Sequence, residues 1–278
     1  MPEVGKLRYL EATPRSEVRG RGTLVLLHAF PLNAGMWEPQ LATCAERGWR
    51  VIAPHFRGFG ASRSDPNGTD LVPVGSDARP TTDDYAGDVI DLLDALHVHE
   101  AVVVGLSMGS YVAFAILRLA ARYVHGLVLA DTRPQADTAE VVESRKRMAQ
   151  LAREHGVRAI AEEMLPKLLG ETTRRERPDV AATIRSLAMS NTPEALAAAL
   201  GALMQRPDST PLLASIHVPT LVIVGEEDGV TPPPIAEEMS KAIAGSQLAI
   251  IPRAGHISNL ENTNAFNEAL TQFLDHRI

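Results

Sequence analysis

Ser107 stands in the pentapeptide Gly105-Leu106-Ser107-Met108-Gly109, which follows the apolar run Ala101–Val104 and precedes the apolar stretch Tyr111–Leu117. A serine on a sharp turn between a buried strand and a helix needs nearly side-chain-free residues two positions before and after it, because the chains pass closely there. This spacing, in this context, is the pattern of a nucleophile elbow. It predicts that the Ser107 hydroxyl is a catalytic nucleophile.

A base and an acid that could activate this serine follow it in the chain. A serine hydroxyl is a poor nucleophile at neutral pH, so it needs a base to take its proton and a carboxylate to orient that base. Asp228 follows the apolar run Leu221–Val224, and His256 follows the run Leu248–Ile251 through a Pro/Gly loop. The order serine, acid, histidine is the one this topology uses. The sequence therefore predicts a catalytic triad of Ser107, Asp228 and His256.

The acid has a rival in the sequence. Asp131 also ends an apolar run and could reach an imidazole from a neighbouring strand, so it competes with Asp228, which we favour. Glu226 and Glu227 are expected to be solvated loop charges.

A second loop predicts the donors of an oxyanion hole. His28, Ala29, Phe30 and Pro31 directly follow a buried apolar run, where a tight loop can aim a backbone N–H at the substrate carbonyl oxygen. Pro31 has no N–H, so we expect Phe30 to be one donor and Met108, the residue after the nucleophile, to be the other. His28 precedes the serine and fits this loop better than the role of base.

Strands and helices must position these residues, and the apolar runs indicate which. Continuous rather than alternating apolar runs favour parallel strands covered on both faces. The predicted buried strands are Thr23–Leu27, Val51–Ala53, Ala101–Val104, Leu127–Ala130, Leu221–Val224 and Leu248–Ile251, with an antiparallel edge strand at Lys6–Ala12. The predicted helices between them are Met36–Glu46, Asp83–Leu96 with Thr82 as N-cap, Pro234–Ala244 and Thr263–Leu274. This alternation predicts an α/β fold with a mostly parallel central sheet flanked by helices.

Residues 132–214 interrupt the alternation. They contain no strand-like run, but four helical segments: Glu140–Arg153, Val157–Leu169, Asp179–Met189 and Pro193–Gln205. Four helices exceed what one crossover needs, so we predict an inserted helical cap at 132–214, over an α/β core of residues 1–131 and 215–278. Few charges stand on the predicted inner stripes of the cap. Its apolar residues either line an acyl pocket or form the cap's own core: Met148, Leu151, Ile160, Met164, Leu168, Ile184, Leu187 and Met204.

Composition excludes several classes of partner. The chain has 278 residues and a net charge of −7, and its basic residues are scattered, which disfavours nucleic acid or an anionic membrane as the main partner. We expect a small-molecule substrate and a monomer or small homo-oligomer. No secretory leader or membrane-spanning stretch is visible, and the single cysteine, Cys44, allows no internal disulfide, which favours a cytoplasmic protein.

These motifs together resemble the α/β-hydrolase superfamily over nearly the whole chain. More narrowly, the segments Leu129–Arg133, Ala161–Pro166 and Arg206–Thr210 resemble a subgroup of small bacterial carboxylesterases that is often labelled 3-oxoadipate enol-lactonase. The resemblance implies hydrolysis of short-chain carboxylic esters through an acyl-enzyme intermediate. It also implies that no metal or organic cofactor takes part, and that a helical cap shapes the acyl and alcohol pockets.

One segment departs from the family pattern. Many relatives carry Asp-x-Arg-Gly-x-Gly-x-Ser after the strand that here ends near Ala53. In this chain His55 takes the place of the aspartate. That aspartate is normally structural, so the exchange is expected to affect loop packing more than catalysis.

Other activities use the same fold. A lactonase would use the same triad on a cyclic ester, and in a cofactor-free perhydrolase or haloperoxidase peroxide would replace water. A C–C bond hydrolase would need polar or cationic groups for the substrate acid, and a haloalkane dehalogenase would carry aspartate at position 107. Some relatives are ligand receptors without turnover. The complete set of Ser107, Asp228 and His256 argues for an enzyme.

Overall fold

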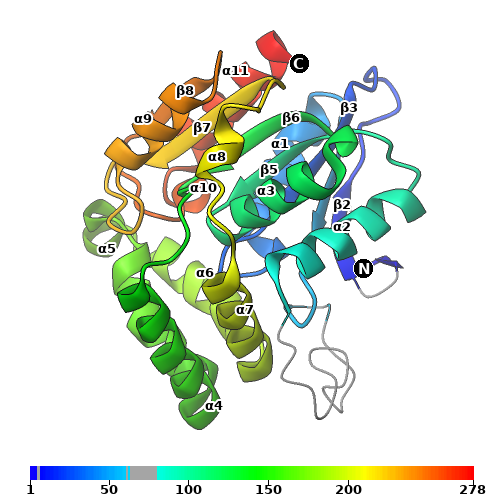
Figure 1. Ribbon diagram of the computed structural model, residues 1–278. Helices are drawn as coiled ribbons and strands as arrows, with labels where there is room; N and C mark the ends of the chain where they lie inside the picture. Colours follow the sequence, from blue (N-terminus) through cyan, green and yellow to red (C-terminus); the bar gives the residue numbers. More distant parts are fainter. Residues whose placement is uncertain (5–6, 61, 63–79) are drawn as a thin grey trace.

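The structure, a computed structural model, describes residues 1–4, 7–60, 62 and 80–278. Within these ranges the strands form one eight-stranded sheet in the order β1-β2-β4-β3-β5-β6-β7-β8 (Figure 1). The strands are β1 Glu3–Val4, β2 Leu7–Ala12, β3 Gly22–Leu27, β4 Trp49–Pro54, β5 Ala101–Leu106, β6 Val124–Ala130, β7 Thr220–Gly225 and β8 Gln247–Ile251.

The sheet is parallel from β4 through β8 in spatial order, and β1 and β2 are antiparallel additions at one edge. The predicted mostly parallel sheet is therefore confirmed, and the predicted edge strand matches β2, although Lys6 lies outside the described residues. The predicted strand at Leu248–Ile251 is confirmed as part of β8, but the prediction that the whole run is buried was wrong, since only Ile251 is buried. β8 is the other edge strand, so Leu248 and Ile250 are exposed because no further layer covers them.

Helices cover both faces of the sheet. α2, α3 and α9 pack on one face, and α1 and α11 pack on the other, so that two apolar clusters form, one on each side. These helices span Thr82–Ala95, Met108–Ala120, Pro233–Ala242, Glu38–Glu46 and Thr263–Arg277, in the order named. Short helical turns lie at η1 Ala34–Trp37, η2 Ala121–Tyr123, α8 Thr210–Leu213 and α10 Ser258–Glu261.

Local sequence explains where α2 begins. Its N-cap is Thr81 rather than the predicted Thr82, because the Thr81 hydroxyl accepts from the Asp84 N–H while the Asp84 carboxylate accepts from the Thr81 N–H. This reciprocal capping box satisfies two backbone donors at the helix start. Within the described ranges, no helix combines the length and the apolar character that crossing a membrane requires.

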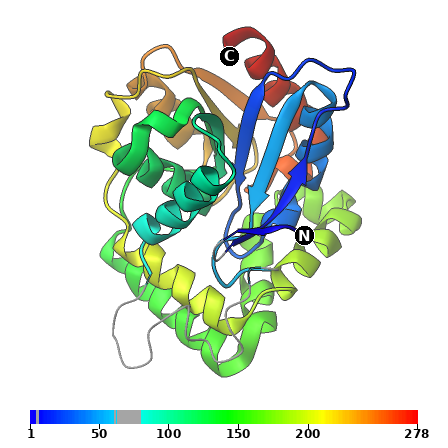
Figure 2. The ribbon, with the colours of Figure 1, turned by 90° about the vertical axis from the view of Figure 1, so that its right-hand side faces the viewer.

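Four helices lie between β6 and the short helix α8 in the chain. They are α4 Ala139–Leu168, α5 Glu171–Glu176, α6 Pro178–Met189 and α7 Pro193–Gln205. Two predicted helices are the halves of α4, which kinks at Gly156 (φ 75°), while α5 was not predicted. Figures 1 and 2 show these helices gathered at one end of the sheet. The segments that lead into and out of this group touch, since the Ser209 N–H donates to the Pro134 carbonyl at 2.8 Å.

Candidate active site

Ser107 lies at the turn between β5 and α3, with φ 53° and ψ −112°, a conformation that a residue with a side chain rarely adopts. The two glycines of the motif make this turn possible. A Cβ on Gly105 would lie 2.5 Å from the Gly109 carbonyl carbon, and a Cβ on Gly109 would lie 2.0 Å from the Leu27 carbonyl oxygen. At both glycines, two stretches of backbone are therefore in direct contact. The turn places the serine at the end of the sheet.

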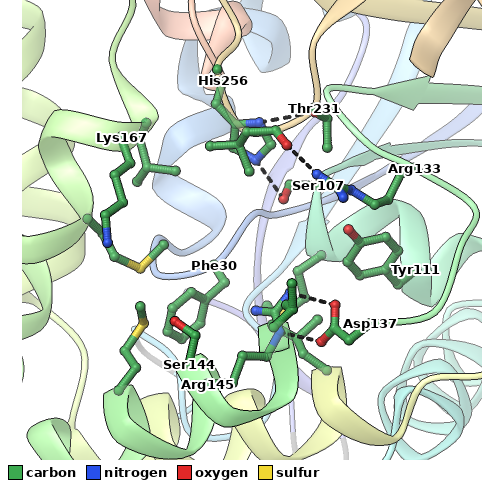
Figure 3. Close-up of a pocket in the computed structure, with 18 of the residues that line it drawn as sticks. Phe30, Ser107, Tyr111, Arg133, Asp137, Ser144, Arg145, Lys167, Thr231 and His256 are labelled. Carbon is green, nitrogen blue, oxygen red and sulfur yellow. Dashed lines mark hydrogen bonds and ion pairs between the residues drawn. The ribbon is translucent and has the colours of Figure 1, made fainter. Parts of the chain in front are cut away.

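The structure brings Ser107, His256 and Asp228 together. The Ser107 Oγ lies 2.9 Å from His256 Nε2 (Figure 3). His256 Nδ1 lies 2.8 Å from Asp228 Oδ2. A carboxylate accepts only, so Nδ1 carries the ring proton and donates it to Asp228. Nε2 is then free to accept the serine hydroxyl. This is the geometry of a nucleophile with its base, and of a base with its orienting acid.

The loop after β7 keeps Asp228 ionised. Its Oδ1 accepts from the backbone N–H groups of Val230 and Thr231, and its Oδ2 accepts from the Thr231 hydroxyl as well as from His256. Burial alone would raise the pKa of Asp228, but the His256 charge and these hydrogen bonds outweigh it and lower the pKa to about 2. Burial likewise opposes protonation of His256, but the nearby carboxylates, Asp228 first, raise its pKa above the ordinary value.

Asp131, the rival acid, lies at the end of β6 and does not contact the imidazole. Its Oδ1 accepts from the Gly225 N–H and its Oδ2 from the Ser258 hydroxyl, so both oxygens are used elsewhere. Burial and the neighbouring Asp228 raise the pKa of Asp131 well above its usual value. The geometry thus places Asp228, and not Asp131, on the histidine.

The predicted oxyanion donors both face the serine region. Phe30 and Met108 line the cavity that Ser107 opens into, and within the described residues neither backbone N–H has an acceptor. Met108 is also the first residue of α3, whose N-terminus favours negative charge. His28 stays outside the cavity. Its Nε2 accepts from the Phe56 N–H, so its Nδ1 donates to the Ala29 carbonyl and fixes the loop.

A cavity of about 460 Å³ opens above Ser107, between the sheet end and the inserted helices (Figure 3). Much of its wall is apolar, with residues from α4, α7 and the Phe30 loop: Phe30, Val141, Met148, Met164, Leu168 and Leu203. Of the residues we expected either to line a pocket or to form the cap's core, Met148, Met164 and Leu168 line the cavity. Ile160 and Ile184 are fully buried in the packing between helices and sheet.

The expectation of few charges on the inner side of the inserted helices was wrong. Arg133, Asp137, Glu140, Arg145 and Lys167 all line the cavity. The helical pattern did not predict them, because Arg133 and Asp137 lie before α4, and long side chains reach the cavity from the edge of a helix stripe. In the described part of the chain, no group of three or more His, Cys, Asp or Glu is placed to hold a metal ion.

Arg133 differs from the other arginines at this end of the cavity. Arg145 and Arg206 both form ion pairs with the Asp137 carboxylate. Burial would raise the pKa of Asp137, but these two cations outweigh it and lower the pKa. Arg133 donates to the Val230 carbonyl and, among the described residues, forms no ion pair with a carboxylate. Figure 3 shows its side chain reaching toward the cavity beside Ser107. The cavity therefore has an uncompensated positive charge near the nucleophile.

Of the two loop glutamates that were expected to be solvated, one differs from expectation. Glu226 is exposed, as predicted for a solvated charge, and accepts from the Arg253 N–H. Glu227 is only half-exposed and accepts from both the N–H and the hydroxyl of Thr172, at 2.8 and 2.5 Å. It thus ties the loop that carries Asp228 to the start of α5.

His55 is buried, 3% exposed, and neither ring nitrogen has a hydrogen-bond partner in the described part of the chain. Gly60 packs on the ring so closely that a Cβ there would lie 2.3 Å from Nδ1. Burial lowers the pKa of His55 to about 4. The ring packs under the loop and lies outside the cavity, which agrees with the structural role expected for it.

Comparison with known proteins adds the family to this geometry. The family model described as alpha/beta hydrolase fold matches residues 22–263. A thermophilic esterase from Thermogutta terrifontis is 37% identical with a TM-score of 0.87, over 97% of this chain and 93% of that one. The 3-oxoadipate enol-lactonase 2 of Acinetobacter baylyi is 30% identical, over 90% of this chain and 87% of its own length.

A third relative, a Synechocystis protein provisionally named a non-heme chloroperoxidase, is also 30% identical, over 90% of each chain. Esterases, lactonases and haloperoxidase-like proteins thus all resemble this chain along nearly its full length. The serine elbow, the histidine loop and the parallel sheet lie within the matched residues. The chain belongs to the alpha/beta hydrolase fold family.

Proposed function

We propose that this protein is a serine carboxylesterase that cleaves short-chain carboxylic esters through an acyl-enzyme intermediate. The observation that carries the proposal is the chain of hydrogen bonds from Ser107 Oγ to His256 Nε2 (2.9 Å) and from His256 Nδ1 to Asp228 (2.8 Å) at the base of the cavity. In this proposal residues 132–214 act as the cap, and residues 1–131 and 215–278 form the catalytic core.

The mechanism follows from these positions. Ser107 Oγ attacks the ester carbonyl carbon while His256 Nε2 takes the hydroxyl proton, and Asp228 stabilises the imidazolium that forms. The N–H groups of Phe30 and Met108 hold the oxyanion. The tetrahedral intermediate collapses as His256 protonates the departing alcohol. Water then gives its proton to His256 and attacks the acyl-enzyme, which releases the acid and restores the serine.

The apolar wall and the volume of the cavity favour a substrate with a short acyl chain. Its apolar side is formed by α4 and α7, and a volume of about 460 Å³ suits a small ester. Burying the acyl group against methionine and leucine side chains contributes about 0.8 kcal/mol per methylene.

Ser107→Ala tests the proposal. We expect kcat for a chromogenic acetate or butyrate ester to fall by at least about 10⁴-fold, because the alanine has no hydroxyl to form the acyl-enzyme. An active-site phosphonate should add its mass to the wild-type protein and not to this variant. Ser110→Ala is the matched control, since its hydroxyl bonds the Gly105 carbonyl and does not line the cavity. Unchanged turnover in a folded Ser107→Ala protein would contradict the proposal.

A second candidate is hydrolysis of an ester or lactone that carries a carboxylate, and the unpaired Arg133 favours it. An arginine beside the nucleophile can bind a substrate carboxylate with charge-assisted hydrogen bonds. Two relatives point the same way, since one is named an enol-lactonase and the thermophilic esterase is described with malate bound.

Arg133→Met separates the two candidates. If the substrate is acidic, kcat/KM for a monomethyl dicarboxylate should exceed that for the matching neutral methyl ester. The substitution should then lower it by about 10 to 10². If the substrate is neutral, the neutral ester should be preferred and the substitution should change its kcat/KM little.

A further inference from the structure

The loop that carries His256 rests on the turn between α4 and α5. The His256 N–H donates to the Leu168 carbonyl at 2.8 Å, and the Gly170 N–H donates to Glu261 Oε2, also at 2.8 Å. Leu168 ends α4, and Gly170 lies in the turn before α5. Both belong to the segment between β6 and β7, called the insert below. Glu261 ends α10, five residues after the histidine. The insert and the histidine loop are therefore joined by two hydrogen bonds, one at the His256 backbone and one at the Glu261 side chain.

These two segments also meet at backbone contact. A Cβ on Gly255 would lie 2.2 Å from the Gly170 nitrogen, and a Cβ on Gly170 would lie 2.8 Å from the Gly255 nitrogen. Neither position has room for a side chain. A shift of the turn at Gly170 must therefore move the residue just before His256.

Glu261 connects the two segments. Its side chain is 2% exposed, and its Oε1 accepts from the Ile257 N–H at 3.0 Å while its Oε2 accepts from Gly170. In the described ranges it forms no ion pair. A buried carboxylate without a cation is costly unless hydrogen bonds and nearby charge development compensate it. Arg177 and Arg253 line a small pocket together with Glu261 without forming an ion pair with it, and the imidazole of His256 is a further nearby group that can become positive.

Several groups face that imidazole. Asp228 comes from the loop after β7, Asp131 from the end of β6 and Glu261 from α10, and each favours the imidazolium, which raises the pKa of His256. The hydroxyls of Ser107 and Thr231 contact the ring, and Arg133 and Lys167 line the cavity beyond it. Of the three carboxyl groups, only Glu261 also fixes the backbone of the histidine loop.

We propose that Glu261 is a positioning residue for His256, which it fixes by bonding the histidine loop to the turn at Gly170 and by stabilising the imidazolium with its buried charge. The proposal rests on the proposed function, in which His256 is the base. It assigns a function to the contact between insert and core. The turn at Gly170 holds the base in place, besides any role the insert has in shaping the cavity.

Glu261→Gln tests both parts of the role. The amide keeps an acceptor for one backbone N–H and loses the charge and the second acceptor. We expect kcat to fall by up to about 10²-fold, because the base is less well placed. His256 must be neutral to act, and removing a nearby negative charge lowers its pKa. The acid limb of the kcat/KM profile should therefore move to lower pH.

Two further variants make the test specific. Glu227→Gln weakens the contact of the same turn with the Asp228 loop, but Glu227 is half-exposed and its charge is screened, so the acid limb should stay where it is. Glu261→Asp keeps the charge but shortens the reach, so kcat should fall while the acid limb returns toward the wild-type position. A Glu261→Gln protein with the wild-type kcat and acid limb, or with the profile of Glu227→Gln, would overturn the proposal.

A measurement without substrate separates this proposal from the proposed function. The proton between His256 Nδ1 and Asp228 gives a low-field NMR signal that follows the titration of the imidazole. In Glu261→Gln, and equally in Ser107→Ala/Glu261→Gln, the midpoint should move to lower pH. An unmoved midpoint would contradict the role of Glu261 even in an active esterase. A moved midpoint in a protein without esterase activity would support Glu261 and contradict the function.

Discussion

Two buried carboxyl groups near one imidazole have opposite properties because their hydrogen bonds differ. Asp228 accepts from two backbone N–H groups, a hydroxyl and His256, which keep it ionised. Asp131 has one backbone donor and one hydroxyl and lies beside another carboxylate, so its pKa is raised by burial and by Asp228. Of these two carboxyl groups, only Asp228 is hydrogen-bonded to the imidazole, and the loop after β7 keeps it charged.

Asparagine substitutions should therefore separate the two. Asp228→Asn should lower kcat by about 10³ to 10⁴, because the amide no longer stabilises the imidazolium or selects the Nδ1–H tautomer. Asp131→Asn should keep kcat within about tenfold, since an amide can accept from Gly225 and donate to Ser258. Kinetics of both variants on one ester check this. Equal losses would mean that Asp131 shares the role of the acid.

Single residues were predictable where they directly follow a strand. Ser107, Asp228 and His256 each come after an apolar run, so the sequence alone predicted that they lie at one edge of the sheet. Glu261, which stands at the end of α10, had no such signal. Glu261 finds its partner Gly170 at a separation of 91 residues, and no local pattern indicates that contact.

At the scale of elements, the end of α6 supports the loop that carries Phe30. The Asn191 amide donates to the Pro31 carbonyl at 2.7 Å and accepts from the Gly60 N–H at 2.8 Å. Asn33 adds a bond to the Ser190 hydroxyl at 2.7 Å. The insert thus contacts the loop with one proposed oxyanion donor as well as the histidine loop.

Asn191→Ala should weaken the first of these contacts. We expect kcat to fall by about tenfold with little change in KM, because an oxyanion donor acts mainly in the transition state. Two buried backbone groups lose their partner, so the free energy of unfolding should fall by about 1 to 3 kcal/mol. Steady-state kinetics and denaturant unfolding measure the two effects. Asn267→Ala, in α11 and bonded to Gln40 and Thr43, should affect stability alone.

The helical and strand elements were largely predictable, because their apolar patterns are continuous. Gly156, with φ 75° and ψ −176°, is non-helical and divides α4 into two halves that match the two predicted helices. One exception has a local cause. The short α5 has the sequence Glu-Thr-Thr-Arg-Arg-Glu, which lacks an apolar stripe. Its position depends on Glu227, which only the folded chain brings near.

At the scale of the whole molecule, buried histidines link stability to pH. Burial lowers the pKa of His28 to about 3 and that of His55 to about 4, although a backbone carbonyl partly offsets the effect at His28. Both rings are neutral in the folded state at pH values where the unfolded chain protonates them. The unfolded state binds more protons below pH about 6.5, so stability falls as the pH drops from there.

His55→Asn should reduce this dependence. Between pH about 6.5 and about 4, the slope of the free energy of unfolding against pH should fall by about 1.4 kcal/mol per unit, the value for one proton. Denaturant unfolding at several pH values in this window, for wild type and variant, gives the two slopes. A loss of packing in the variant lowers the free energy of unfolding by the same amount at every pH, so it does not affect the comparison of slopes. Parallel curves would contradict a neutral His55.

The contact between Ser209 and Pro134 has a consequence for how this protein can change. The insert leaves the sheet region and returns to it at two neighbouring points. They are joined by this 2.8 Å hydrogen bond and by one of 2.9 Å from Arg206 to the Gln135 carbonyl, so the insert's ends meet whatever its length. A recombined gene could exchange everything between these points and still rejoin the same backbone ends. The replacement would have to preserve the contacts with the site loops, which include those at Leu168, Gly170, Thr172 and Asn191. Substrate range could thus diversify by exchange of one module while the hydrolytic chemistry is inherited intact.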